Sequence, residues 1–281
     1  MEFWKNLLAF FEAEMPEPAS FGWFHFMWVV IIAAFTVFIC IKFKDCSDKT
    51  LRLISLIVFI TLVVFDLYKQ ITYDWVDYDE ATDKFVWDYA WASFPFQLCS
   101  SPHYILPFVI WLPDGKVRDA FVGFMSFFSL VGGLCVFVYP ESCFTEFIGV
   151  NIQTMLHHGM QITLGVFYAV HERRKYNIRY YLRSTPVFFA YFGIAMLLNV
   201  VVHHALRANG MDDTFNMLYI SPYHESNLPI FDTISVSVPY PVLLISYLVG
   251  LMIASLIVYG VVYGIMLLSK KKTAGKSYAD I

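Results

Sequence analysis

The fold of this chain is decided by one stretch, GVNIQTMLHHGMQITLGVF at residues 149–167. This stretch is long enough to cross a bilayer and mostly apolar, yet its centre carries the adjacent imidazoles of His157 and His158. An ionisable side chain at membrane depth is energetically unfavourable and normally faces protein rather than lipid. The stretch therefore predicts a helix inside a bundle, with its polar side turned towards other helices.

The polar side chains of this stretch gather on one side of the predicted helix. Residues on an α-helix step by about 100°, so Gln153, His157 and Gln161 form one stripe, with Thr154 and His158 beside it. The remaining face holds Ile152, Met155, Leu156, Met160 and Ile162. A helix that is half polar at bilayer depth must turn that half towards the interior of the bundle.

The composition is that of a membrane protein, with 58% hydrophobic and 15% charged residues, against about a quarter charged in soluble domains. We therefore predict an all-α fold, a polytopic seven-transmembrane-helix bundle. The spans are expected at roughly 22–43, 52–71, 93–112, 119–139, 147–170, 184–206 and 240–269. We predict three parts, namely an interfacial amphipathic segment at 1–19, the bundle at 20–269 and a basic tail at 270–281.

The basic residues alternate between the predicted loops. The segments 42–52, 116–118, 173–183 and 270–276 hold 15 of the 19 Lys and Arg residues. Because positive residues remain cytoplasmic, the N-terminus is predicted outside and the C-terminus inside the cell. We expect a multi-pass protein of the plasma membrane, a bacterial cytoplasmic membrane in the simplest case. The net charge of −4 does not suggest a nucleic-acid partner, and no oligomeric state is specified.

Other chemically active side chains lie in the neighbouring spans. Cys99 and His103 are four residues apart and are expected to share a helical face, with Pro102 able to kink the helix between them. Asn199 and His203 have the same spacing near the outer end of the sixth span. We predict a single outward-facing polar chamber that contains Cys99, His157, His158, Asn199, His203, Gln153, His103, His25 and Gln97.

A thiol beside a neutral imidazole is the minimal pair of nucleophile and base, and in a membrane the natural ester to attack is a phospholipid acyl chain. Alternatively, several imidazoles and a thiol form a zinc or copper site. Neither an HxxxH nor a CxxC spacing is present, and we predict no metal and no cofactor. A buried cysteine is also a common packing residue, and a buried histidine is often a structural hydrogen-bonding group.

Short motifs occur in a familiar order along the chain, namely FGWFH at 21–25, PFQLCS at 95–100, the paired histidines at 157–158, Asn199, and the pattern of Asn216, Tyr219 and Pro222. In this order they resemble the YwaF-like family of bacterial multi-pass membrane proteins. That family is similar to eukaryotic transmembrane acyltransferases that remodel ether phospholipids without acyl-CoA. It is more distantly similar to membrane hydrolases of branched fatty-acid esters, which use a Thr and a His.

The resemblance implies an intramembrane Cys–His pair. Cys99 occupies the matching LC motif and His157 is the better match for the base, with His158 as the alternative. Gln97 departs from the family pattern, because a His is often found at that position. This departure leaves the role of position 97 in proton transfer open.

The favoured function is a lipid acyltransferase or lipid hydrolase that forms a transient acyl-thioester on Cys99, with His157 as general base and membrane phospholipids as substrate. Two alternatives stay open. One is a transporter or receptor-like protein that binds a small molecule or metal in the chamber. The other is a structural protein whose polar groups only hold the helices together.

Overall fold

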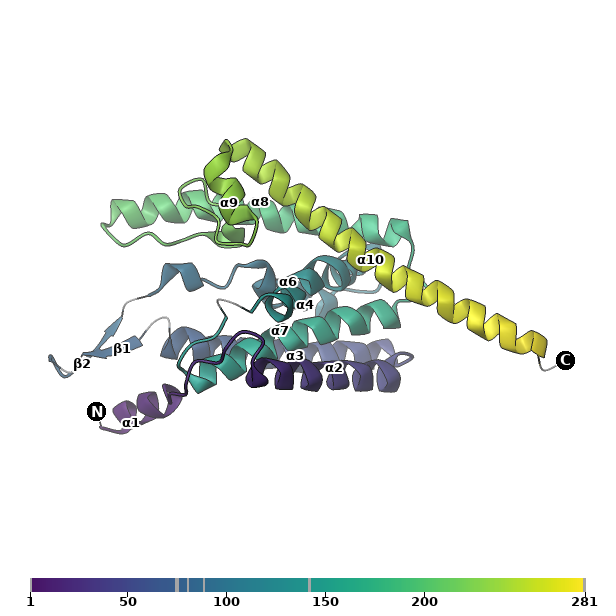
Figure 1. The fold of residues 1–281 in the computed structure, drawn as a ribbon, viewed down its shortest axis with the longest axis horizontal. Coiled ribbons are helices and arrows are strands. Elements are labelled where there is room, and N and C mark those ends of the chain that lie inside the picture. Colours follow the sequence, from purple (N-terminus) through teal and green to yellow (C-terminus); the bar gives the residue numbers. More distant parts are fainter. Residues whose placement is uncertain (1, 74–75, 80, 88, 141–142, 280–281) are drawn as a thin grey trace.

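The computed structural model describes residues 2–73, 76–79, 81–87, 89–140 and 143–279, and beyond residue 267 it describes the backbone alone. Its α-helices are α1 Glu2–Phe11, α2 Trp23–Phe43, α3 Asp48–Thr72, α4 Ser101–Trp111, α5 Lys116–Phe124, α6 Leu130–Val138, α7 Ile148–His171, α8 Ile178–Ala208, α9 Phe231–Ser237 and α10 Tyr240–Ala279. The long helices run along the long axis of the molecule (Figure 1).

Shorter elements connect these helices. Strands β1 Val76–Asp79 and β2 Lys84–Trp87 form an antiparallel hairpin, which the sequence analysis did not predict. Single helical turns are η1 Trp91–Ser93, η2 Leu98–Ser100 and η4 Met217–Tyr219, and a π-helical turn, η3 Met125–Ser129, joins α5 to α6 without a break. The hairpin lies at the same end of the bundle as α1, opposite the C-terminus (Figure 1).

Five of the seven predicted spans are helices long and apolar enough to cross a membrane. They are α2, α3, the continuous segment Lys116–Val138, α8, and Tyr240–Leu267 of α10. Helix α7 has 24 residues, but its polar stripe lowers its mean hydropathy. The division at 1–19, 20–269 and 270–281 stays a prediction, since α10 continues as helical backbone to Ala279 and the side chains of the tail lie outside the described part.

The third predicted span, 93–112, is not a continuous helix. Only Ser101–Trp111 is α-helical, and residues 94–100, the unwound segment, enter the bundle as irregular backbone that ends in η2. Pro102 lies in the first turn of α4, where its missing N–H is not needed. The predicted shared helical face of Cys99 and His103 is wrong, because Cys99 precedes the helix, and no α-helix runs between them for Pro102 to kink.

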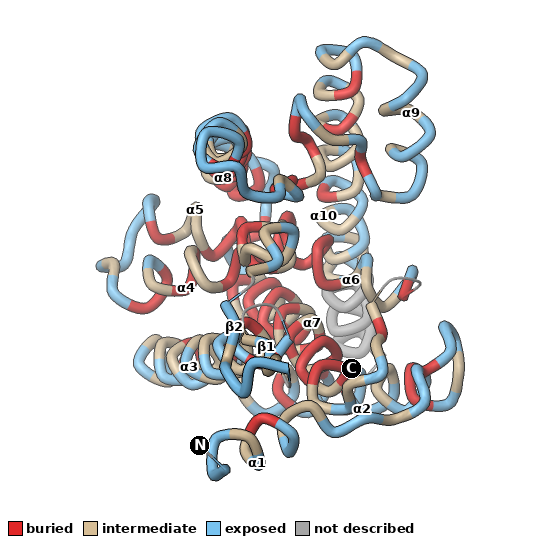
Figure 2. The backbone as a smooth tube through the Cα atoms, turned by 90° about the vertical axis from the view of Figure 1, so that its left-hand side faces the viewer, coloured by how far each residue is buried: buried red, intermediate tan, exposed pale blue. Residues whose placement is uncertain are grey.

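The core of the bundle lies around α7 and the α5–α6 segment, where buried residues concentrate (Figure 2). A Cβ atom at Gly132 of α6 would lie 3.1 Å from the backbone nitrogen of Cys99. A Cβ atom at Gly133 would lie 3.1 Å from the carbonyl oxygen of His158. These two glycines let α6 approach both the unwound segment and α7 closely.

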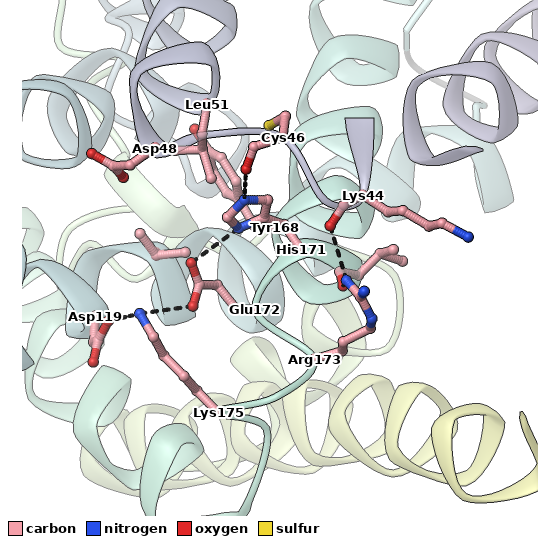
Figure 3. Close-up of polar contacts among 12 residues, drawn as sticks. Lys44, Cys46, Asp48, Leu51, Asp119, Tyr168, His171, Glu172, Arg173 and Lys175 are labelled. Carbon is pink, nitrogen blue, oxygen red and sulfur yellow. Dashed lines mark hydrogen bonds and ion pairs between the residues drawn. The ribbon is translucent and has the colours of Figure 1, made fainter. Parts of the chain in front are cut away.

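A polar cluster joins the turns at 44–47 and 172–177 at one end of the bundle (Figure 3). His171 donates through Nε2 to the carbonyl of Cys46 at 3.1 Å and through Nδ1 to Glu172 at 3.2 Å. Lys175 lies 2.8 Å from the Glu172 carboxylate. Burial alone would raise the pKa of Glu172, but these two cations hold that pKa below its ordinary value.

The loop 209–230 folds back into the bundle. Four of its own side chains are buried, those of Phe215, Met217, Leu218 and Ile220. Leu218 and Tyr219 have left-handed backbone conformations, with φ values of 55° and 57°. Two consecutive non-glycine residues in this region must be held by their surroundings, and such strain is common at functional sites.

Candidate functional site

The unwound segment brings four consecutive backbone carbonyls, those of residues 97–100, into the bundle, and each accepts a hydrogen bond from a side chain. The four bonds are Tyr191 Oη to Gln97 at 2.9 Å, Gln161 Nε2 to Leu98 at 3.3 Å, His157 Nε2 to Cys99 at 3.0 Å, and His103 Nδ1 to Ser100 at 3.0 Å. Irregular backbone at membrane depth requires such partners. His157 and Gln161 of the predicted polar stripe therefore hydrogen-bond to the backbone where the third span is not helical.

Gln161 is the central side chain of this arrangement. Its amide nitrogen also donates to the carbonyl of Ser129 at 2.7 Å and lies 2.9 Å from the hydroxyl of Ser129. The hydroxyl of Ser101 donates to that of Ser129 at 3.0 Å. All three residues are fully buried and join α7, η3 and α4. Gln161 belongs to the predicted polar stripe but is not among the predicted site residues, although its position one turn from His157 is a signal for that role.

The contacts of His157 define its tautomer. A ring nitrogen that faces a carbonyl oxygen must donate, so Nε2 carries the proton and Nδ1 carries a lone pair. This Nδ1 atom is buried and has no hydrogen-bond partner among the described residues. The imidazole is thus oriented by the backbone of Cys99, and in its neutral form it has a free acceptor nitrogen.

His103 lies beside His157 and uses the other ring nitrogen, Nδ1, for its hydrogen bond. Its Nδ1 donates to the carbonyl of Ser100, and its Nε2 is buried without a partner in the described part of the chain. The ring centroids of His103 and His157 are 5.3 Å apart. Two imidazoles, each with an unfilled acceptor position, therefore lie side by side next to Cys99.

The thiol of Cys99 is free and half-buried in η2. In the described structure it makes no hydrogen bond to His157 or His158; the contact between residues 99 and 157 runs through the carbonyl. His158 donates through Nδ1 to the carbonyl of Thr154, one turn back on its own helix, at 2.7 Å. Of the adjacent pair, His157 is therefore the residue that contacts Cys99.

Gln97 in the unwound segment and Asn199 on α8 both bond to the 209–230 loop. Asn199 is fully buried and holds Met217 from both sides: its Nδ2 donates to the Met217 carbonyl at 3.0 Å and its Oδ1 accepts from the Met217 N–H at 2.7 Å. Gln97 Nε2 donates to the carbonyl of Asn216 at 2.8 Å. These bonds attach the strained part of the loop to α8 and to the unwound segment.

Three of the predicted chamber residues make their contacts elsewhere. His25 is buried against the aromatic rings of Phe21 and Phe137. His203 bonds to Asp213, and Gln153 contacts its neighbour Thr154. Two pockets of about 240 and 380 Å³ lie near the N-terminal segment, and neither is lined by Cys99 or His157. Fewer side chains therefore lie around Cys99 than the predicted polar chamber contains.

Comparisons with known proteins bear on the whole chain. Neither the curated proteins nor the solved structures yielded a match. A sequence model of the TMEM164 family, a membrane protein family, matches residues 20–259, from the entry to α2 into α10. The matched range contains the unwound segment, both histidines of α7 and the loop held by Asn199. The chain is therefore a membrane protein and belongs to the TMEM164 family.

Proposed function

We propose that this protein is a lipid acyltransferase or lipid hydrolase in which Cys99 is the nucleophile and His157 the general base. The observation that carries the proposal is the 3.0 Å hydrogen bond from His157 Nε2 to the Cys99 carbonyl. It brings a buried imidazole to the residue that holds the thiol and leaves Nδ1 of the same ring as a free proton acceptor.

The reaction follows from that tautomer. Nδ1 of His157 takes the thiol proton, and the Cys99 thiolate attacks the carbonyl carbon of a phospholipid ester. The tetrahedral intermediate breaks its bond to the glycerol oxygen, which takes the proton from His157 and leaves as a lysophospholipid. The acyl chain then forms a thioester with Cys99. The Cys99 carbonyl stabilises the Nε2–H of the imidazolium that forms in between.

The second half of the reaction sets the class of enzyme. An alcohol that attacks the thioester, with His157 again as base, yields an acylated acceptor, whereas water yields a free fatty acid. Phospholipids are the expected donors because the pair lies among helices whose outer faces are apolar. The resemblance to the YwaF-like family and its acyltransferase relatives supports the same class.

A structural role for the same side chains is the main rival, since the bonds to residues 97–100 alone account for much of the polar stripe. A transporter or receptor-like protein is the other. In either case no acyl group would become bound to Cys99. The free nitrogen of His157 supports the enzyme, because it belongs to a ring that bonds directly to the residue holding the thiol.

Thioester formation is the decisive measurement. We expect purified protein incubated with phospholipids that carry a labelled acyl chain to yield lysophospholipid and a hydroxylamine-sensitive acyl group on the peptide that contains Cys99, both detected by mass spectrometry. Cys99→Ala should abolish both products, because no other group replaces the thiol. Cys135→Ala, which removes an exposed thiol on α6, is the matched control and should keep wild-type turnover. Wild-type turnover in Cys99→Ala would refute the mechanism.

We also propose seven passes, with the N-terminus outside a bacterial plasma membrane. Five passes are the apolar helices, the sixth is α7, and the seventh combines the unwound segment with α4. The turns rich in Lys and Arg lie at one end of the bundle. A membrane-impermeant maleimide should label Lys84→Cys in intact cells and Arg174→Cys only after permeabilisation, since both positions are exposed at opposite ends. The reverse pattern would contradict this topology.

A further inference from the structure

A second cluster of polar side chains lies away from Cys99, where the 209–230 loop returns to α8. His203, near the end of α8, donates through Nδ1 to Oδ2 of Asp213. His224 Nε2 contacts the same carboxylate oxygen at 3.1 Å. The three potential ligand atoms all lie within 4.8 Å of one another. Two imidazoles and one carboxylate thus converge on one point from three separate parts of the chain.

The cluster is sheltered and held in place. The Asp213 side chain is 5% exposed, that of His203 is 17% exposed and that of His224 is 27% exposed. The ring of Tyr223 stacks on His203 with the ring centroids 3.5 Å apart and the planes 6° from parallel. The N–H of Phe215 points at the second carboxylate oxygen of Asp213 at 3.4 Å. These contacts limit the rotation of two ligand side chains, as second-shell contacts do in metal sites.

We propose that His203, Asp213 and His224 bind a divalent transition-metal ion, with zinc as the best fit. Zinc accepts imidazole nitrogen and carboxylate oxygen, and three protein ligands leave the fourth tetrahedral position to water. Zinc–ligand bonds of about 2.0–2.1 Å place the ligand atoms of a tetrahedral site about 3.3 Å apart. His224 and Asp213 are 3.1 Å apart, close to that value, whereas His203 and Asp213 share a short hydrogen bond and must separate to admit the ion. Each imidazole binds through the nitrogen that now faces Asp213, in the tautomer with its proton on the other nitrogen.

The position of the ligands gives the metal a structural effect. Asp213 and His224 flank the part of the loop that contains the left-handed residues Leu218 and Tyr219, and His203 lies one helical turn from Asn199, which holds Met217. A metal that joins these three ligands closes the loop onto α8. Its binding free energy would stabilise the folded loop over its open forms. The site does not depend on acyl chemistry at Cys99.

Metal binding can be measured directly on purified full-length protein. We expect one zinc per chain after incubation with zinc and desalting, measured by elemental mass spectrometry, and a visible absorption band on titration with Co²⁺. His203→Ala, Asp213→Asn and His224→Gln should each weaken Co²⁺ binding by more than about tenfold. His224→Gln and Asp213→Asn retain polar side chains of similar size, so their loss of binding would not reflect misfolding.

His204→Ala is the matched control. His204 is adjacent to His203 in sequence, but its Nε2 contacts the hydroxyl of Tyr223 at 3.2 Å and not Asp213. It should bind Co²⁺ like the wild type. Equal loss in His204→Ala, unchanged binding in the three ligand variants, or no stoichiometric zinc in the wild type would each overturn the proposal.

The effect on the loop has its own readout. With zinc at about 100 times its Kd, hydrogen exchange across residues 209–225 should slow by about 100-fold if opening of the loop releases the metal. The same addition should leave exchange in His203→Ala unchanged. Equal rates with and without zinc in the wild type would contradict the closure of the loop onto α8.

Discussion

His157→Gln is expected to lower acyl turnover by about 10²–10⁴-fold, the usual contribution of a general base. The substitution separates two roles of this residue. A glutamine amide can still donate to the Cys99 carbonyl, as His157 Nε2 does at 3.0 Å, so the unwound segment keeps its partner. It has no basic nitrogen to replace Nδ1. The measurement is the rate of lysophospholipid formation by purified variant and wild type.

His158→Gln is the control for this experiment. Its Nδ1 bonds to the carbonyl of Thr154 on the same helix and not to the unwound segment, so its replacement should keep most of the activity. Thermal unfolding of both variants tests whether the bundle is intact. If His157→Gln turns over lipid at the wild-type rate, the imidazole has only a structural role. If His158→Gln shows the larger loss, the base has been assigned to the wrong histidine.

Gln161→Leu is expected to lower the free energy of unfolding by about 2–4 kcal/mol, the largest change in stability that we predict. The substitution keeps the size of the side chain but removes the donor that reaches the carbonyls of Leu98 and Ser129. Leu98 keeps the N–H of Ser101 as a backbone partner, so the cost is that of the lost side-chain hydrogen bonds, including the one to the Ser129 hydroxyl, at about 0.5–1.5 kcal/mol each. Equilibrium unfolding of the protein in detergent micelles, compared with wild type, measures the difference.

Gln153→Leu provides the comparison, because Gln153 lies on the same stripe of α7 and is also buried but makes no bond to the unwound segment among the described residues. It should destabilise the protein by less than Gln161→Leu. Both variants replace a glutamine by leucine on the same helix. The difference between their free energies of unfolding therefore measures what the hydrogen bonds of Gln161 contribute to stability. Equal losses would mean that this support adds nothing measurable.

The sequence predicted the general architecture well, because hydropathy and helical periodicity are local properties. The inward orientation of the α7 stripe is confirmed, since Gln153, His157 and Gln161 are buried. Membership of a membrane protein family agrees with the composition. The proposed acyl chemistry and the identity of the catalytic pair stay predictions.

The contacts of the candidate site were less predictable, and Cys99 and His203 show why. The helical spacing of Cys99 and His103 suggested a shared face, but the backbone around Cys99 is not α-helical. Asn199 and His203 have a similar spacing on a real helix, yet one holds Met217 and the other bonds to Asp213 in the loop. The partners Asp213 and His224 were missed because they lie in a loop without periodicity.

By itself, the sequence determined that this chain is a helical membrane protein with a polar face of α7 buried inside it, because the hydrophobic effect and the exclusion of polar groups from lipid act on each span separately. Only the tertiary structure decided that the third span breaks at residues 94–100. Backbone carbonyls can remain unwound at membrane depth only where donors reach them, and local N–H groups supply only part of what this segment needs, at Gln97 and Leu98. Tyr191, Gln161 and His157 supply such donors from two helices distant in sequence, so the break depends on packing that no local pattern records.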